Sequence, residues 1–237
     1  MAYLKHHVGP PPVPPPPYPG FPEPSVFLLA GNTTSVGITG PGTATMQGAP
    51  VLPLGTMADG KKCWIFDAAT QLAVTGHGLA AVNSVSFLAG FSMPAQVGQH
   101  YLIALEDGSN AGQGRFDAYS DGGQLNWRRQ RDDTSISATT GYMGNPGQPS
   151  YYGISQAFGA GGKLICYSTT FGEDPLIYDT PQTVSNNIDG ILYLMAGGAG
   201  FFIPMEAGTQ LRYFLVWPTA ITAAKMKAWK AWLDYQP

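Results

Sequence analysis

Short apolar runs separated by glycine and small polar residues fill the chain after its first 25 residues, and they constrain the fold more than any other feature. Each run has the length of a strand and is rich in β-branched or aromatic residues. Strands do not alternate with helices, so the pattern favours an all-β antiparallel sandwich over residues 26–237. The expected strands are VFLLAG (26–31), KCWIFDA (62–68), SVSFLAGF (84–91), YLIALEDG (101–108), GRFDAYSDGG (114–123), QLNWRRQR (124–131), GKLICYSTTF (162–171), GILYLMAGG (190–198) and LRYFLVW (211–217).

Alternation assigns side chains to faces in two of these strands. The odd-numbered residues from 85 to 91 are expected on one face of their strand, and the odd-numbered residues from 211 to 217 on one face of theirs. The connection SDGGQ predicts a hairpin, because Gly122 and Gly123 supply the positive φ angles of a tight turn.

One helix is indicated, at the end of the sequence. It is expected at about residues 222–233, with Thr222 as its N-cap. An apolar stripe is formed by Met226, Trp229 and Leu233, with Trp232 at its edge. The residues expected to face away are Lys225, Lys227 and Lys230. A helix with this stripe is expected to pack on the sandwich.

A proline-rich segment precedes the domain. Ten of the fifteen residues from Pro10 to Pro24 are proline, which excludes a helix or a central strand because proline fixes φ and lacks the amide donor. We expect an extended arm, residues 1–25, in the polyproline conformation. Two interpretations stay open: a disordered linker, or an ordered arm that docks on a partner. In the second, the expected docking residues are Pro12, Tyr18 and Phe21.

Charge and cysteine usage argue against several classes of protein. Only 11% of the residues are charged, less than half of the roughly 25% usual in soluble domains. A net charge of −3 offers no basic surface for nucleic acid. No signal peptide or membrane span is indicated, so synthesis in the cytoplasm is expected. Cys63 and Cys166 lie within apolar runs and are expected to be buried, reduced thiols.

No catalytic motif is present. The sequence lacks a Gly-x-Ser-x-Gly elbow, a phosphate loop, His-Glu-x-x-His and Cys-x-x-Cys. His77 and His100 stand alone beside glycines and are expected at the surface. We therefore expect no enzymatic activity, no metal and no cofactor.

The order of the strands resembles that of a known superfamily. The pieces VSFLAGFSMP, YLIALEDG, FDAYSDGGQLNWR, GKLICYSTTFG and LYLMAGGA, closed by LRYFLVWPTAITAAKMKAW, are similar to the laminin-G and concanavalin A-like lectin superfamily over residues 26–233. The resemblance implies a jelly roll of two curved sheets, with functions that range from glycan binding to protein binding and plain structure. The Glu-x-Asp-x-x-Glu motif of its glycoside hydrolases is absent. Of the calcium cluster of legume lectins only the segment Asn186–Gly190 is a faint candidate, which also suits a simple turn.

The densest charge cluster lies in one expected strand. It comprises Arg128, Arg129 and Arg131, next to Asp132 and Asp133. One interpretation is an interface at which arginines pair with a neighbouring subunit. The other is a solvated strand end with local Arg–Asp pairs of little energetic weight.

The segment GYMGNPGQPSYYG, residues 141–153, is expected to be a loop and is the best candidate for a glycan site. Sugars present an apolar face and a polar rim, which exposed tyrosines with neighbouring amides complement. The candidate glycan-binding residues are Tyr142, Asn145, Tyr151 and Tyr152. Packing of the same loop on a protein neighbour is an equal alternative.

Low charge, high glycine content and the proline-rich arm also resemble bacteriophage virion proteins in style. The leading hypothesis is a non-enzymatic virion protein, a capsid decoration or fibre-like component. Its arm would dock on other virion proteins in a homo-oligomer or larger assembly, with the sandwich facing outward. The alternative is a carbohydrate-binding, lectin-like module that recognises a surface polysaccharide. A glycoside hydrolase comes third.

Overall fold

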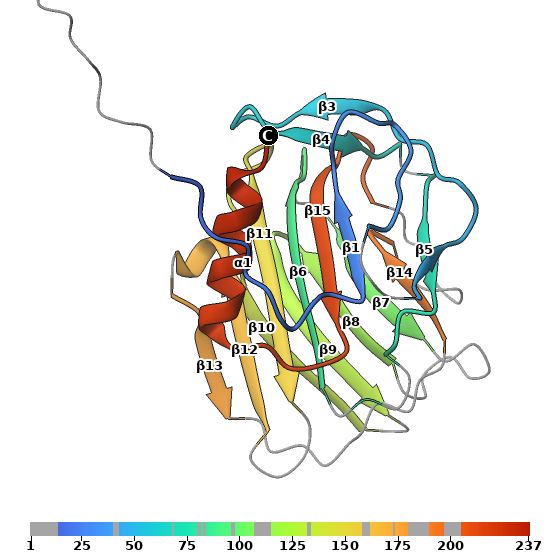
Figure 1. The fold of residues 1–237 in the computed structure, drawn as a ribbon. Helices are drawn as coiled ribbons and strands as arrows, with labels where there is room; N and C mark the ends of the chain where they lie inside the picture. The colour runs from blue at the N-terminus through green and yellow to red at the C-terminus, as the bar shows by residue number, and fades with distance from the viewer. Residues whose placement is uncertain are drawn as a thin grey trace, which may run out of the picture.

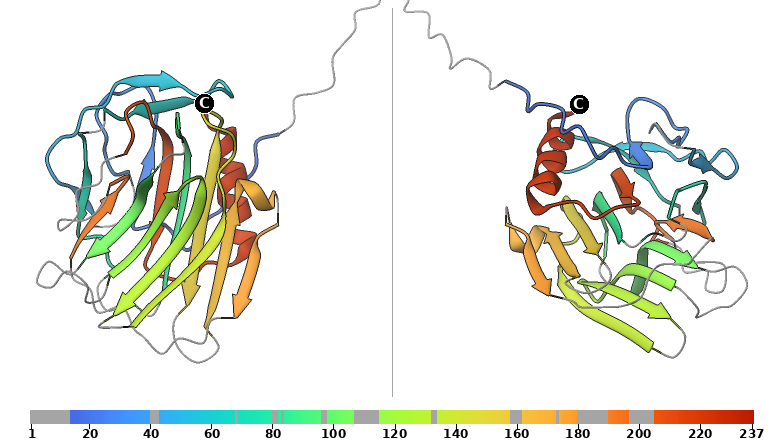
Figure 2. Two further views of the ribbon diagram at one scale, coloured as in Figure 1. Left: turned by 180° about the vertical axis from the view of Figure 1, so that it is seen from behind. Right: turned by 60° about the horizontal axis from the view of Figure 1, so that its bottom comes forward.

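The computed structural model of the chain describes residues 14–39, 43–67, 69–79, 82, 84–95, 98–106, 115–131, 134–157, 162–172, 174–179, 190–196 and 205–237. Two antiparallel sheets face each other, and a C-terminal helix, α1 (Ala223–Tyr235), lies on the outer side of one of them (Figures 1 and 2). The expected antiparallel β-sandwich with a short C-terminal helix is therefore confirmed.

The sheet beneath α1, called the first sheet here, has eight strands within the described residues. Seven follow the order β13-β12-β11-β6-β15-β4-β3, and β1 pairs with β15 as well. Their bounds are β1 Val26–Leu29, β3 Leu54–Thr56, β4 Lys62–Ile65, β6 Ser84–Ser92, β11 Ser150–Ala157, β12 Lys163–Ser168, β13 Leu176–Asp179 and β15 Gln210–Trp217.

The second sheet has the order β10-β9-β8-β7-β14-β5-β2. Its bounds are β2 Thr45–Met46, β5 Leu72–Thr75, β7 Gln99–Glu106, β8 Arg115–Asp121, β9 Gln124–Arg131, β10 Thr134–Tyr142 and β14 Ile191–Leu194. A short 3-10 helix, η1 (Thr169–Phe171), follows β12. All nine expected strands occur, but the sequence did not indicate β2, β3, β5, β10, β11 or β13.

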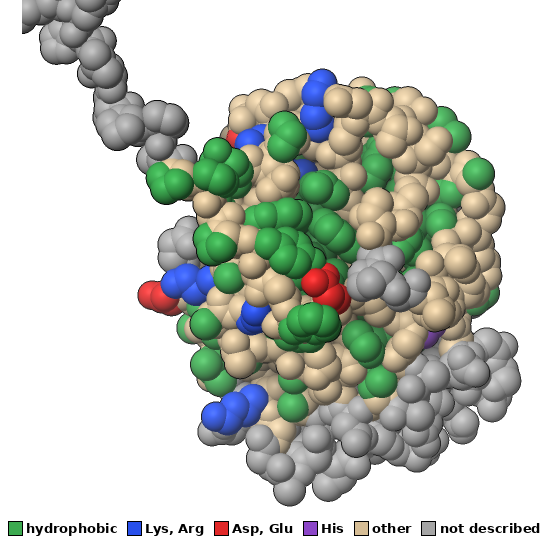
Figure 3. Space-filling model, viewed as in Figure 1, with side chains coloured by type: hydrophobic (Ala, Val, Ile, Leu, Met, Phe, Trp, Pro, Cys, Tyr) green, Lys and Arg blue, Asp and Glu red, His purple; other side chains and the backbone are tan. Residues whose placement is uncertain are grey.

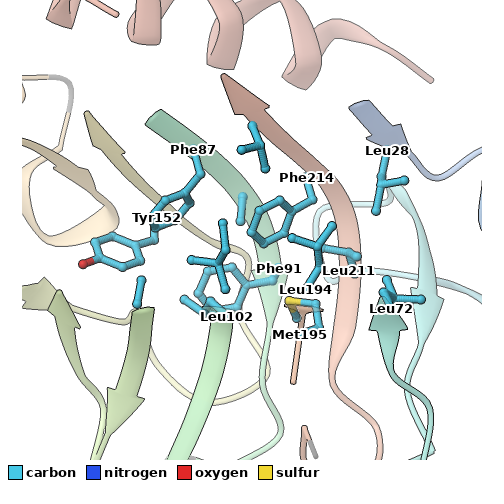
Figure 4. Close-up of a cluster of buried hydrophobic side chains, with 14 of the residues drawn as sticks. Leu28, Leu72, Phe87, Phe91, Leu102, Tyr152, Leu194, Met195, Leu211 and Phe214 are labelled. Atoms are coloured by element: carbon cyan, nitrogen blue, oxygen red, sulfur yellow. The ribbon is translucent and has the colours of Figure 1, made fainter. Parts of the chain in front are cut away.

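The hydrophobic core lies between the two sheets (Figure 4). Phe87 stacks on Phe214 at a ring-centroid distance of 5.9 Å and meets Tyr152 edge-on at 5.3 Å. The odd-numbered residues from 85 to 91 all point into this core, as predicted. The even-numbered Leu88 of the same strand packs under α1 instead.

The prediction for β15 is wrong at one residue, Leu211. A register shift interrupts the pairing of β15 with β6, in which Leu211 faces Phe91 but Tyr213 faces Gly90. One extra residue in a strand is a β-bulge, and it changes which side chains share a face. Leu211 therefore enters the core between the sheets (Figure 4), whereas Tyr213 and the odd-numbered residues after it face α1.

The predicted hairpin and helix are confirmed. Gly122 and Gly123 have φ angles of 56° and 82° and connect β8 to β9. The Thr222 side chain accepts a hydrogen bond from the Lys225 amide at the start of α1. The buried stripe of the helix consists of Met226, Trp229 and Leu233. Burial of this stripe on Leu88, Tyr213, Leu215 and Trp217 holds α1 against the first sheet.

The arm packs on α1 and β15 through residues 18–22. The Tyr18 ring meets Trp229 and Trp232 edge-on, at centroid distances of 5.3 and 5.2 Å. The Lys225 ammonium donates a hydrogen bond to the Pro19 carbonyl, and the Trp217 indole donates to the Pro22 carbonyl at 2.9 Å. Hydrophobic side chains gather where the arm crosses the helix (Figure 3).

The three docking residues predicted for the arm differ in their surroundings. Pro12 lies outside the described residues. Tyr18 contacts the chain's own helix, and Phe21 is 84% exposed. Their contact with a partner stays a prediction.

Both cysteines are buried and unpaired, as expected, and burial raises the pKa of Cys166 to about 12.

Candidate binding site

A pocket of about 290 Å³ lies on the outer face of the first sheet, beside the C-terminal half of α1. Its lining comes from β6, β11, β15, the connections between β3 and β4 and between β10 and β11, and the helix. The residues that define its chemistry are Gly90, Tyr151, Arg212, Tyr213, Lys230 and Asp234. We call it the helix pocket.

A row of three residues across neighbouring strands contributes to the lining. Gly90 of β6 faces Tyr151 of β11 on one side and Tyr213 of β15 on the other. A Cβ atom on Gly90 would lie 2.5 Å from two ring atoms of Tyr213, closer than side chains can approach. Glycine in a strand often marks such a close approach. Here it allows the Tyr213 ring to lie over the β6 backbone.

Arg212 is the extra residue of the β-bulge in β15. Its Nη2 atom donates to the carbonyls of Leu233 and Gln236, both at 2.8 Å, at the C-terminal end of α1. The Leu233 carbonyl also accepts from the Gln236 amide at 3.2 Å, and the Gln236 carbonyl accepts from Lys61 Nζ at 2.9 Å. Carbonyls at the C-terminal end of a helix carry partial negative charge, so a cation is favourable there. The residue is 4% exposed, and its Nε and Nη1 atoms have no hydrogen-bond partner.

Lys230 connects the helix to the Tyr151 ring. Its Nζ atom lies 4.5 Å from the ring centroid and forms a salt bridge with Asp234 one turn further along α1. The Tyr151 hydroxyl donates to the Gly172 carbonyl, and its ring lies 4.8 Å from that of Tyr167. The ring is therefore held from several sides beside the polar groups of the pocket.

The other predicted glycan residues lie near the pocket but do not line it. Tyr142 ends β10 and is 51% exposed. Asn145 is exposed in the turn between β10 and β11, where its carbonyl accepts from the Gln148 amide at 3.0 Å. Backbone amides of Tyr142 and Tyr151 both bind threonine hydroxyls of η1, which brings these two tyrosines to the same end of the sandwich.

The prediction for Tyr152 is wrong. Residues 150–153 belong to strand β11 and not to a loop, so consecutive side chains point to opposite faces. Tyr151 lies on the outer face, and Tyr152 is completely buried between the sheets with its hydroxyl hydrogen-bonded to Thr140. A surface ligand cannot reach it.

Sequence reasoning missed Gly90, Arg212, Tyr213 and Lys230. A signal existed for two of them: Gly90 interrupts an apolar strand, and Arg212 is the charged residue in the run LRYFLVW. Lys230 was expected to face away from the sandwich, but its side chain is only 16% exposed because it folds over Tyr151.

The predicted arginine cluster lies on the second sheet, away from the helix pocket. Arg128 binds the buried carboxylate of Asp117 at 2.8 Å and donates to the Tyr101 hydroxyl at 3.2 Å. Arg129 and Arg131 lie in β9, and their side chains are outside the described residues. Local pairing of Arg128 is therefore observed, while an interface with a neighbouring subunit stays a prediction.

His77 is buried rather than exposed, so the expectation for it is wrong. Its Nδ1 atom accepts from the Leu79 amide at 3.1 Å, and its Nε2 atom lies 2.8 Å from the Gly190 carbonyl.

Within the described ranges, no cluster of three His, Cys, Asp or Glu could hold a metal ion, and no helix is long and apolar enough to cross a membrane. Of the faint calcium candidate, residues 186–189 lie outside these ranges.

Neither a protein-family model nor a curated protein matches this chain, but solved structures share its fold. The binding domain of botulinum neurotoxin DC in complex with SialylT has a TM-score of 0.61 at 12% identity, covering 89% of this chain and 51% of that one. The same domain in complex with rat synaptotagmin II has a TM-score of 0.61 at 10% identity, with the same coverage. The CBM40 domain of the Ruminococcus gnavus IT-sialidase, bound to α2,3 sialyllactose, has a TM-score of 0.51 at 9% identity, covering 62% and 82%.

These similarities show the fold alone, a jelly-roll β-sandwich like that of lectin-like domains. The chain spans about half the length of the neurotoxin domains. All three are binding domains rather than catalytic domains, and two are complexes with glycans by their descriptions. The expected jelly-roll β-sandwich is thus confirmed, while a lectin-like role and a relation to bacteriophage virion proteins stay predictions.

Proposed function

We propose that this chain is a non-enzymatic carbohydrate-binding module and that the helix pocket is its binding site. The observation that carries the proposal is the Tyr151 ring, which lies in a pocket between a glycine and the charged pair Lys230–Asp234. A sugar ring has an apolar face that suits an aromatic side chain and hydroxyls that suit charged groups at its edge. Pockets for small ligands commonly combine apolar walls with a few placed polar groups.

The fold supports this proposal without deciding it. Two similar domains are described as glycan complexes, but a third is described in complex with a protein, rat synaptotagmin II. The helix pocket favours a small ligand, because its volume of about 290 Å³ lies at the lower end of the range for small-molecule sites. Anchoring of the arm to a virus particle remains a separate hypothesis, for which Phe21 is the most exposed aromatic residue of the described arm.

The test is a glycan array followed by calorimetric titration of the best ligand into the wild-type protein and two variants. Tyr151→Ala removes the aromatic ring of the pocket, and Tyr142→Ala removes an exposed tyrosine outside it. We expect Tyr151→Ala to weaken binding at least about tenfold, which corresponds to about 1.4 kcal/mol. Tyr142→Ala should bind as the wild type does.

Two results would count against the proposal. Loss of binding in Tyr142→Ala alone would move the site to the turn between β10 and β11. Absence of binding by the folded wild-type protein across neutral and acidic glycans would remove the glycan-binding function itself.

A further inference from the structure

We propose that the ligand of the helix pocket is an acidic sugar whose carboxylate is bound by Arg212. The inference rests on the proposed function and adds the chemical class of the ligand. It starts from the buried cation that lines the pocket.

The Arg212 guanidinium is only partly satisfied. Arginine has five N–H donors, and two of them, both on Nη2, bind the carbonyls of Leu233 and Gln236. The three donors on Nε and Nη1 have no partner. Stabilising the end of α1 therefore accounts for one nitrogen of Arg212 and leaves the other two unexplained.

The positive charge also lacks a carboxylate partner. Among the described residues no salt bridge involves Arg212. Asp234 is paired with Lys230, and the exposed Asp59 accepts from the Lys61 amide at 3.1 Å. An arginine that is 96% removed from solvent without an anion is costly, because a buried charge needs pairing to offset its lost hydration.

An anion in the pocket would supply the missing partner. Lys230 and Asp234 already neutralise each other, so Arg212 is the buried charge of the pocket that lacks an anion, and the exposed Asp59 in the lining disfavours a multiply charged ligand. A carboxylate on a sugar ring meets both requirements, since it carries one charge and accepts hydrogen bonds from guanidinium nitrogens. The sugar ring itself would lie against Tyr151.

The experiment compares matched ligands on the intact protein. Galacturonic acid oligosaccharides and sialyllactose are each titrated beside their carboxyl-reduced forms, which keep the rings and hydroxyls but lose the charge. At least one acid should bind the wild type about tenfold or more tightly than its reduced form. That preference should decline as sodium chloride is added.

Arg212→Gln provides the second arm of the test, with circular dichroism to check folding. The variant should lose the preference for the acid while it still binds the reduced sugar. Equal affinity of the wild type for the acid and its reduced form would show that the pocket does not recognise a carboxylate, and would leave the proposed glycan binding intact. A preference for the acid that persists in folded Arg212→Gln would show that Arg212 does not bind the carboxylate. No binding of any sugar, acidic or neutral, would overturn the proposed function and this inference together. If the variant does not fold, the comparison of acidic and reduced ligands on the wild type alone decides whether the pocket prefers an acidic sugar.

Discussion

The Lys230 ammonium lies 4.5 Å from the centroid of the Tyr151 ring, and this contact joins α1 to β11 beside the helix pocket. The lysine comes from the C-terminal helix and the tyrosine from a strand in the middle of the sequence. Any ligand that uses the Tyr151 ring therefore depends on the docking of α1. A change that loosens the helix is expected to weaken binding even when it lies outside the pocket.

Replacement of Lys230 by methionine tests this contact. A cation over an aromatic ring contributes about 0.5–2 kcal/mol, which here helps to hold the Tyr151 ring in place. We expect Lys230→Met to loosen the ring and to weaken glycan binding by at most about thirtyfold, as measured by calorimetry. Lys227→Met is the matched control, because Lys227 lies on the same helix and pairs with the exposed Asp174 away from the pocket. Equal losses in both variants would contradict a specific role for Lys230.

Substitution of Gly90 by alanine is expected to damage the pocket from beneath. The new methyl group would collide with the buried Tyr213 ring, and overpacking of this kind costs about 1–3 kcal/mol. We expect a lower urea midpoint and loss of glycan binding in Gly90→Ala. Gly31→Ala is the control, since a Cβ atom there meets nothing within 4 Å. Wild-type binding by Gly90→Ala would show that the close approach is not needed.

Removal of the Tyr18 ring should destabilise the whole domain. Tyr18 contacts Trp229 and Trp232 edge-on, and such pairs contribute about 0.5–1.5 kcal/mol beyond buried area. Tyr18→Ala is expected to lower the free energy of unfolding by about 1–2 kcal/mol in urea titrations. Phe21→Ala, at an 84% exposed position in the same arm, should stay within about 0.5 kcal/mol of the wild type. A larger loss of unfolding free energy in Phe21→Ala than in Tyr18→Ala would mean that the arm is not held by Tyr18.

The ion pair between Arg128 and Asp117 predicts an unequal response to mutation. Arg128→Met leaves the fully buried Asp117 carboxylate without its guanidinium and should cost about 2–4 kcal/mol. Asp117→Asn should cost less, because the Arg128 side chain is 23% exposed and can turn toward water. A double-mutant cycle by chemical denaturation measures the coupling, with the exposed pair Lys227–Asp174 as the reference for a weak contact.

Burial of Cys166 predicts both slow alkylation and a pH effect. Because burial raises its pKa from 9.0 to about 12, the group stays a neutral thiol near neutral pH and should react with iodoacetamide only after unfolding. A raised folded-state pKa contributes stability that is fully present below the unfolded value of 9.0 and is lost as the pH rises toward 12. Cys166→Ser should show a smaller loss of stability over this pH window. Rapid labelling of the native protein at neutral pH would contradict the burial.

Local signals explain which parts of the structure could be predicted from the sequence. The Gly122–Gly123 hairpin and the capped C-terminal helix follow from residues that are neighbours in the chain, and both predictions are confirmed. The face of Leu211 could not be predicted, because the bulge at Arg212 depends on how β15 meets β6. The strand β11 was taken for a loop on account of its glycine and proline neighbours, and the error placed Tyr152 on the wrong side of the sheet.

The helix pocket was only partly predictable for the same reason. Tyr151 was identified as a glycan candidate, but the residues that surround it come from β6, β15 and α1, which are distant in the sequence. No periodicity brings Gly90, Tyr213 and Lys230 together. Their association arises from strand pairing and helix docking, which a single sequence does not encode locally.

The position of β15 has a consequence for the synthesis of the protein. This strand lies between β6 on one side and β1 and β4 on the other, so residues 210–217 complete a sheet whose first strand begins at residue 26. On a translating ribosome the earlier strands emerge long before their central neighbour, and their unpaired edges are open to wrong partners in the meantime. We therefore expect chains that stop before residue 210 to aggregate rather than to accumulate as a smaller folded domain.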